Sequence, residues 1–435
     1  MDPAIIAGII LLVGIAVLLV LAVPIAVAVG ISSFVALAVV IGAEPAVFVS
    51  SQRMFTGINS FSLLAIPFFI LAGELMNTGG IAGRLIDAAK VLVGRMPGSL
   101  AQTNVVANAL FGSVSGAAVA SAAAIGTVMG PRQRTEGYER AYSAAVNVSS
   151  APAGMLIPPS NTLIVYSLVS STSIATLFMA GYGPGLLWAL TCMAVVFFYT
   201  RRHPVAAAHE RVPLGVAVRT LLRAVPSLLM IVIVIGGILT GIFTPTESAV
   251  IAVLYCLALG AAYQQIRLPQ LPRILLDAAR TSAIVMLLVG VSTIMSWVMS
   301  YSKIPRLISD SLLGLTESPA VILLLILVIL LAVGTFMDPT PAILIFTPIF
   351  LPIVSTFGVD PVHFGLIITF SLCLGTITPP VGNVLFVGAR VAGLRVESVI
   401  RALVPFFAAL ILALLVVAFV PQLSLWLPGV MGLLE

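Results

Sequence analysis

The uncharged stretch from Ala141 to Thr200 decides the fold: AYSAAVNVSSAPAGMLIPPSNTLIVYSLVSSTSIATLFMAGYGPGLLWALTCMAVVFFYT has no Asp, Glu, Lys or Arg in sixty residues. One bilayer crossing takes about 20 consecutive apolar residues, so this stretch is long enough for two. The whole chain has the same character, because 8% of its 435 residues are charged, against about 25% in a soluble domain. The sequence therefore predicts an all-α polytopic membrane protein embedded in the lipid bilayer.

Several classes of function are excluded by the reactive residues. Neither Lys90 nor Lys303 ends a G-x-x-x-x-G-K-[ST] loop, so ATP hydrolysis is not expected. The basic residues form short clusters between apolar runs rather than one solvated face, which argues against nucleic-acid binding. The segment Gly112–Gly116 has Val114 at its centre, so it does not match the G-x-S-x-G signature of a hydrolase. We expect neither an enzyme nor a bound organic cofactor.

Clusters of basic residues set the expected topology. The chain carries five of them, at Arg84 to Arg95, Arg132 to Arg140, Arg201 to Arg223, Arg267 to Arg280 and Arg390 to Arg401. Because basic loops are retained in the cytoplasm, all five predict cytoplasmic segments. This assignment gives about ten transmembrane helices and places both termini on the opposite side of the membrane.

Two uncharged stretches do not fit full crossings. Residues 99–131 lie between two basic clusters, so they must begin and end on one side, yet they are too few for two spans and a turn. We therefore expect a re-entrant helical hairpin that reverses near Gly112–Gly116. Residues 319–357, interrupted at Gly334–Pro339, predict a second hairpin that enters from the other side.

An internal repeat appears at a spacing of 221 or 222 residues. Pro158-Pro159 recurs as Pro379-Pro380, and Gly112 recurs as Gly334. Each unit makes an odd number of crossings, so the second unit is inverted relative to the first. The predicted units are residues 1–223 and 224–435. Inverted repeats with interrupted helices are typical of secondary transporters, which bind their substrates at the interruptions, whereas a channel needs no such repeat.

Four interrupted segments are the candidate binding elements. Unwound backbone deep in a membrane persists only where it is buried in protein or lines a cavity. Gly112–Gly116 and Ile157–Thr162 supply hydroxyl, amide and carbonyl oxygens without an ionisable group. Such oxygens suit Na+ better than zinc or iron. Gly334–Pro341 and Thr376–Asn383 add threonines, an amide and the carboxylate of Asp338.

Asp338 is the acid placed most deeply within an apolar run, and an ionisable residue inside the membrane indicates a functional site. A second interpretation is structural, since Asp before Pro339 is a good N-cap for the helix that follows. The two roles are compatible. For Ser113 and Ser115, the alternative to ion binding is a packing seam of small residues between helices.

Five short motifs in order give the chain a resemblance to a known family. They are Gly112-Ser-Val-Ser-Gly116, Ile157-Pro-Pro-Ser160, Gly241-Ile-Phe-Thr-Pro-Thr-Glu247, Met337-Asp-Pro-Thr340 and Thr378-Pro-Pro-Val-Gly382. In a chain of this length, the set resembles the large membrane subunit of TRAP (tripartite ATP-independent periplasmic) transporters. The resemblance covers essentially the whole chain.

The resemblance implies partners, location and mechanism. It implies a bacterial or archaeal inner-membrane protein with periplasmic termini, a separate small four-helix membrane subunit and a periplasmic substrate-binding protein. Transport would be driven by Na+ and elevator-like, with hairpins and broken helices moving as one block. Carried over by residue, one Na+ site falls on Ser113, Ser115, Gly116 and Ser160. The other falls on Gly334, Asp338, Thr376 and Thr378. The substrate region between them takes in Asn161, Thr335, Thr340, Pro379 and Asn383.

The expected function is sodium-coupled import of an organic anion such as a C4-dicarboxylate, a 2-oxo acid or a sugar acid. Helix N-termini at the breaks carry partial positive charge and would hold a carboxylate without a membrane-embedded arginine. The alternative is a one-component Na+/carboxylate symporter of similar hairpin architecture that needs no binding protein.

Overall fold

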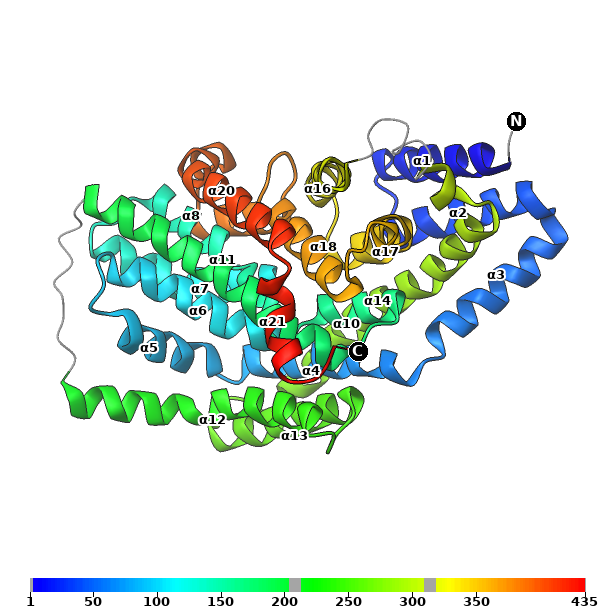
Figure 1. Cartoon of the computed structure of the whole chain (residues 1–435). Helices are drawn as coiled ribbons and strands as arrows, with labels where there is room; N and C mark the ends of the chain where they lie inside the picture. The colour runs from blue at the N-terminus through cyan, green and yellow to red at the C-terminus, as the bar shows by residue number, and fades with distance from the viewer. Residues whose placement is uncertain (1–2, 203–212, 309–317, 435) are drawn as a thin grey trace.

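The computed structural model describes residues 3–202, 213–308 and 318–434, and all regular secondary structure in these ranges is helical. Seven of the described helices are long and apolar enough to cross a membrane, and shorter apolar helices such as Ala4–Val20, Ile25–Ile41 and Pro319–Gly334 accompany them. The predicted all-α polytopic class is therefore confirmed (Figure 1).

The helices follow one another without a strand in the described ranges. In the first half they are α1 (Pro3–Val20), α2 (Ile25–Ile41), α3 (Ala43–Ile58), α4 (Ala65–Thr78), α5 (Ile81–Val93), α6 (Ser99–Ser115), α7 (Ala118–Thr135), α8 (Arg140–Ser150), α9 (Ala153–Leu156), α10 (Asn161–Ser170) and α11 (Ile174–Arg202). In the second half they are α12 (Leu214–Leu239), α13 (Pro245–Ala262), α14 (Leu271–Tyr301), α16 (Pro319–Gly334), α17 (Pro339–Thr356), α18 (Pro361–Gly375), α19 (Asn383–Ala392), α20 (Val396–Phe419) and α21 (Gln422–Val430).

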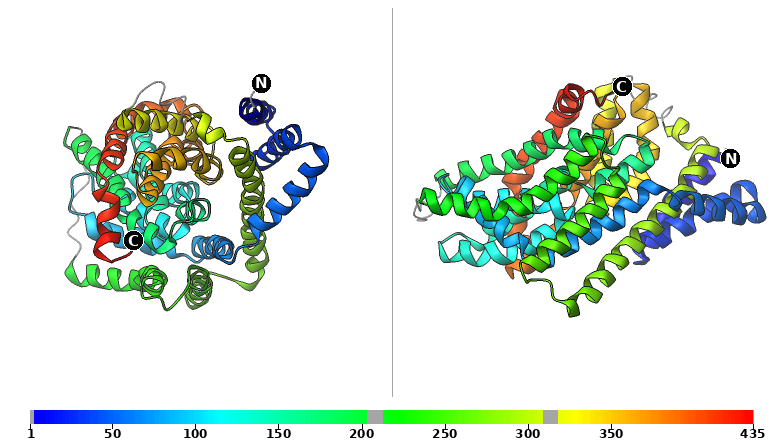
Figure 2. Two further views of the ribbon diagram at one scale, coloured as in Figure 1. Left: turned by 45° about the vertical axis from the view of Figure 1, so that its right-hand side comes forward. Right: turned by 90° about the horizontal axis from the view of Figure 1, so that it is seen from below.

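Two groups of helices position the site. Long helices form the outer group: α4 packs on α13 and α14, α2 packs on α14, and α5 packs on α12. The inner group contains the hairpins α6–α7 and α16–α17 together with α8 to α11 and α18 to α20. Figures 1 and 2 show α12 and α13 along one edge and α3 at the far side, with α10, α17 and α18 between them.

Both hairpins form where the sequence predicts them. The first consists of α6 and α7, which reverse direction at Gly116 and Ala117, and the second consists of α16 and α17, which are joined by residues 335–338. The predicted spans 141–165 and 364–388 are not continuous helices. The first is divided into α8, α9 and α10, and the second into α18 and α19, because tandem prolines interrupt the helical hydrogen-bond ladder in each. The division into repeats at residues 223 and 224 stays a prediction.

Contacts between basic clusters gather them at one end of the molecule, here called the basic end. Arg132 at the end of α7 lies 3.8 Å from Asp87 of α5. Arg140 at the start of α8 donates from Nη2 to the Ala392 carbonyl at the end of α19, 2.7 Å away. The Arg84 guanidinium lies over the Tyr263 ring, just after α13. Clusters that are far apart in sequence therefore meet in space.

Acidic side chains cap helices on the outer and inner groups alike. Thr244 and Glu247 form a capping box at the start of α13, so the structural interpretation of this glutamate is confirmed. Asp338 caps α17 by accepting from the Thr340 N–H at 3.2 Å. Asp360 caps α18 in the same way, accepting from Val362 at 2.7 Å. In both of these helices a proline follows the aspartate, where its missing N–H costs nothing.

Candidate functional site

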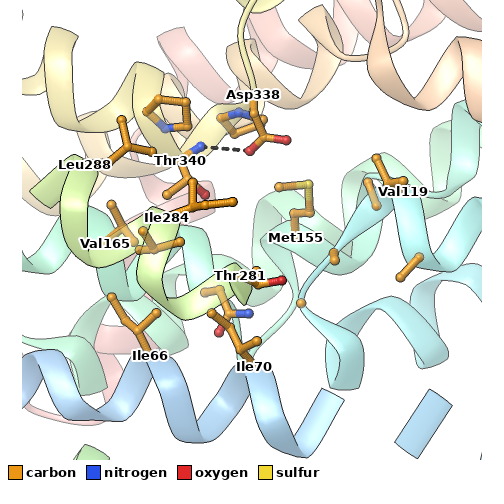
Figure 3. A pocket seen from close by; sticks show the side chains of 18 of the residues that line it. Ile66, Ile70, Val119, Met155, Val165, Thr281, Ile284, Leu288, Asp338 and Thr340 are labelled. Atoms are coloured by element: carbon orange, nitrogen blue, oxygen red, sulfur yellow. Dashed lines mark hydrogen bonds between the residues drawn. The ribbon is translucent and has the colours of Figure 1, made fainter. Parts of the chain in front are cut away.

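A cavity of about 510 Å³ lies where the two hairpin tips meet the outer helices. Its wall takes Ser115 to Ala120 from the first tip and Asp338 to Pro341 from the second, together with Asn161 and Thr376 from the broken helices. The remaining wall comes from α2, α4 and α14. Figure 3 shows Asp338 and Thr340 opposite Ile66 and Ile70 of α4, with Met155 and Thr281 between them.

Glycine chemistry shapes the first tip. Gly116 ends α6 with φ +63°, a left-handed conformation that an L side chain rarely adopts, and its N–H bonds to the Gly112 carbonyl at 2.8 Å. A Cβ on Gly116 would lie 2.8 Å from Asn161 Nδ2. The tip therefore sits directly against the break between α9 and α10. A sequence with two glycines three residues apart permits both the turn and the approach.

A glycine-on-glycine crossing fixes each hairpin to a broken helix. In α6, a Cβ on Gly112 would lie 2.7 Å from the Gly154 Cα, so the two backbones touch without intervening side chains. In α16, a Cβ on Gly334 would lie 3.0 Å from the Gly375 Cα in α18. The two crossings are 222 and 221 residues apart in sequence. Sequence analysis found Gly112 and Gly334 but not their partners.

The second tip is tied to the second break by backbone hydrogen bonds. The Gly382 N–H donates to the Thr335 carbonyl at 3.0 Å, and the Val384 N–H donates to the Thr376 carbonyl at 3.1 Å. The Asn383 side chain also lies within hydrogen-bonding range of the Asp338 carboxyl group. Residues from two segments thus form one polar cluster around Asp338.

Hydroxyl groups at the breaks are oriented as cation ligands. Ser113 Oγ donates to the Leu110 carbonyl at 2.9 Å, and Ser160 Oγ donates to the Met155 carbonyl. Thr376 and Thr378 donate from Oγ1 to Cys373 and Leu374, both at 2.7 Å. Each hydroxyl directs its hydrogen to a backbone carbonyl, which leaves oxygen lone pairs for another partner. Ser115 Oγ is buried and has no hydrogen-bond partner.

The expected sodium ligands divide into those in the cavity wall and those behind it. Four line the cavity: Ser115, Gly116, Asp338 and Thr376. Four lie behind the wall, buried or half-buried: Ser113, Ser160, Gly334 and Thr378. The structure places each set beside its own glycine crossing. The assignment of ions to them stays a prediction.

The expected substrate residues divide in a similar way. Asn161 and Thr340 line the cavity. Thr335 is buried behind the second tip, Asn383 reaches Asp338, and Pro379 is exposed outside the cavity wall.

One side of the cavity escaped the sequence analysis, because it belongs to outer helices without breaks. Thr281, Ile284, Val285 and Leu288 line it from α14. On α4 the lining residues are Ile66, Ile70, Gly73, Glu74 and Asn77. Both sets follow the spacing of one helix face, a period that could have indicated them.

The electrostatics of the cavity combine acids with helix N-termini. Among the described residues that line it, the charged side chains are Glu74 and Asp338, with no Lys, Arg or His. Residues from the first turns of α7, α10, α17 and α19 also line it. Ser160 and Asp338 cap α10 and α17, but the N-caps of α7 and α19, Ala117 and Gly382, make no side-chain cap. Two helix N-termini therefore present uncapped N–H groups.

Paired hairpins, proline-broken helices and a cavity at their meeting point define the chain as a secondary membrane transporter of the interrupted-helix class. Its sequence matches, over residues 12–423, the family described as the tripartite ATP-independent periplasmic transporter, DctM component. The chain belongs to this family. It is the large membrane subunit of a transporter and not an enzyme, which confirms the resemblance.

Relatives of known name agree with this family. The chain is 53% identical to the protein YgiK of Salmonella typhimurium, across 91% of each chain. It is 37% identical to the sialic acid TRAP transporter large permease protein SiaM of Vibrio cholerae, across 91% of this chain and 93% of the other. It is also 37% identical to the C4-dicarboxylate TRAP transporter large permease protein DctM of Pseudomonas aeruginosa, across 92% and 93%.

A solved structure shares the fold. The YdaH transporter of Alcanivorax borkumensis superposes with a TM-score of 0.62 over 91% of each chain, at 16% sequence identity. At this identity the likeness concerns the fold alone.

Proposed function

We propose that this chain imports an organic anion across the inner membrane, coupled to Na+, after a periplasmic binding protein delivers the anion. The uncapped N-terminus of α7 in the cavity wall carries the proposal. Ala117 caps no N–H group, and Ala118, Val119 and Ala120 line the cavity with small apolar side chains. A carboxylate placed there would satisfy free N–H groups and meet the positive end of the helix dipole.

Sodium coupling follows from the charge of the cavity. Glu74 and Asp338 make the wall acidic, so an incoming anion meets like charge unless a cation binds with it. Two unit charges about 4 Å apart interact by roughly 4 kcal/mol at an effective dielectric constant of about 20. That energy corresponds to roughly a thousandfold in affinity. Bound Na+ would therefore make anion binding possible, which is the thermodynamic requirement of coupled transport.

The two glycine crossings support an elevator-like movement. Gly112 with Gly154, and Gly334 with Gly375, hold each hairpin on its broken helix by direct backbone contact. The cavity, in contrast, separates the hairpin tips from α2, α4 and α14. The inner group is thus built to move as one block past the outer helices.

The partners come from the family and its relatives. A tripartite transporter requires two proteins besides this chain, which we take to be a small four-helix membrane subunit and a periplasmic binding protein. SiaM and DctM, at the same 37% identity to this chain, bear names for different acids, a sialic acid and a C4-dicarboxylate. We infer an organic acid as substrate, with selection resting largely on the binding protein.

Reconstituted uptake tests the proposal. Proteoliposomes containing this chain and the small subunit are given radiolabelled organic acids, with or without an inward Na+ gradient and the purified binding protein. We expect uptake only when Na+ and binding protein are both present. Uptake with Na+ alone would favour the one-component symporter, and flux independent of any gradient would indicate a channel.

Ser115→Ala should weaken sodium dependence without unfolding the protein. The Ser115 hydroxyl lines the cavity without a hydrogen-bond partner, so its removal breaks no internal bond. Losing one neutral ligand should raise the Na+ concentration for half-maximal uptake by roughly 3- to 10-fold, in line with one hydrogen-bond-sized interaction. Titration of uptake against Na+ measures the change.

Ser371→Ala is the matched control for this substitution. Ser371 is fully buried in α18, bonds to the Ile367 carbonyl at 2.8 Å and does not line the cavity. Its removal should leave the Na+ titration unchanged. Equal Na+ dependence in Ser115→Ala and wild type would remove Ser115 from the ion site.

A further inference from the structure

A second cavity, of about 530 Å³, lies between α7, α8 and α19 at the basic end of the molecule. We call it the amide cavity, after Asn104, Gln133 and Asn147 in its wall. It shares no lining residue with the cavity at the hairpin tips. Its volume falls within the usual range of small-molecule sites, about 300–1,000 Å³, and is far larger than an inorganic ion requires.

Buried polar groups in this wall lack partners. Asn104 is 1% exposed and its Nδ2 makes no hydrogen bond, because its Oδ1 accepts from Asn108 at 2.9 Å and so turns the amide nitrogen away. Ser143 Oγ, in a side chain 7% exposed, is also without a partner. Gln133 is fully buried, and its Oε1 has no donor while its Nε2 bonds to Leu100. A buried polar group without a partner is costly, so these atoms indicate a ligand.

The charge of the wall determines the kind of ligand. Arg134 and Arg140 line the amide cavity, and no described lining residue is acidic. Arg140 donates from Nη2 to the Ala392 carbonyl at 2.7 Å, which fixes its guanidinium at the cavity edge with other N–H groups available. A planar carboxylate matches the guanidinium fork and can also accept from Asn104 and Ser143.

Gln133 adds a requirement, because its free oxygen accepts a hydrogen bond that a bare carboxylate cannot donate. A hydroxyl group on the ligand supplies that donor. We propose that the amide cavity binds a small organic hydroxycarboxylate, held by the two arginines, Asn104 and Ser143 through its carboxylate and by Gln133 through its hydroxyl.

Cysteine protection tests the site directly. Thr127 lines the amide cavity and is exposed, whereas Cys192, Cys256 and Cys373 are buried. Thr127→Cys in purified protein is treated with N-ethylmaleimide in choline chloride, without Na+, and with malate, succinate or inorganic phosphate. At ten times its dissociation constant, malate should slow labelling by about tenfold, because only the ligand-free fraction reacts. Succinate should need roughly 2- to 10-fold higher concentration, for want of one hydrogen bond.

Variants in the Thr127→Cys protein distinguish the site from general charge. Arg134→Gln and Arg140→Gln should each raise the malate concentration for half-protection by about 10-fold or more, as expected for a charge-assisted hydrogen bond. Arg132→Gln is the matched control, since Arg132 is exposed on the same helix near Asp87 and does not line the cavity. Ser143→Ala removes one donor and leaves the charges in place, so it tests the assignment even if an arginine variant misfolds.

Three outcomes would overturn the proposal. They are protection by phosphate but not by malate, equal protection in the arginine variants and the Arg132→Gln control, and no protection by malate at all. Asp338→Asn in the Thr127→Cys protein should keep full protection, because Asp338 belongs to the other cavity. Failure of the proposed sodium-coupled transport would therefore leave this result unaffected.

Discussion

Asp338→Asn is expected to abolish sodium-dependent uptake at ordinary Na+ concentrations while the protein remains folded. Asparagine caps a helix about as well as aspartate, so the bond to the Thr340 N–H at the start of α17 can persist. The negative charge is lost, and a unit charge next to Na+ is worth several kcal/mol even at a dielectric constant of about 20. The Na+ concentration for half-maximal uptake should rise by roughly 100-fold, measured by titrating proteoliposome uptake against Na+.

Asp360→Asn is a closely matched control. Asp360 also stands before a proline and caps a helix, accepting from Val362 at 2.7 Å and His363 at 3.2 Å, but it does not line the cavity. The two variants share the same chemistry of capping and differ in access to the cavity. A sodium response that is equal in both would assign the effect to helix capping and remove Asp338 from the ion site.

The breaks were predictable because proline and glycine act locally. Tandem prolines at Pro158 and Pro379 cannot continue a helical ladder in any environment, and the structure ends helices before both. The second hairpin, predicted over residues 319–357, closely matches α16 and α17, which span Pro319 to Thr356. Its boundaries follow from apolar length and from Asp338, which is a cap by its own chemistry.

The outer wall of the cavity and the amide cavity were not predictable in the same way. Thr281 follows Arg280 in sequence, so it looked like part of a basic loop, and only the packing of α14 turns it toward the hairpins. Asn104, Gln133 and Ser143 come from three helices and meet only in three dimensions. Single polar residues inside apolar helices give no sign of their orientation until the helices are packed.

The largest effect on folding is expected from a methyl group at either glycine crossing. In Gly154→Ala the new Cβ would overlap the Gly112 backbone, and in Gly375→Ala it would overlap the Gly334 backbone. Backbone cannot move aside as a flexible side chain does, so each hairpin must separate from its broken helix. Overpacking of this kind destabilises by about 1–3 kcal/mol or more. Purified variants should show a clearly lower melting temperature, and uptake should fall further than the remaining folded fraction explains, because the ion sites lie beside the crossings.

Gly236→Ala separates the crossing from the general effect of adding a methyl group. Gly236 lies within α12, and a Cβ there would meet nothing within 4 Å. Since alanine favours a helix over glycine by up to about 1 kcal/mol, this variant should be as stable as wild type or slightly more so. If Gly154→Ala and Gly375→Ala both melted with Gly236→Ala and transported normally, hairpins and broken helices would not be held by backbone contact. The moving block inferred above would then lose its mechanical basis, since the hairpins could shift independently of the helices that complete each ion site.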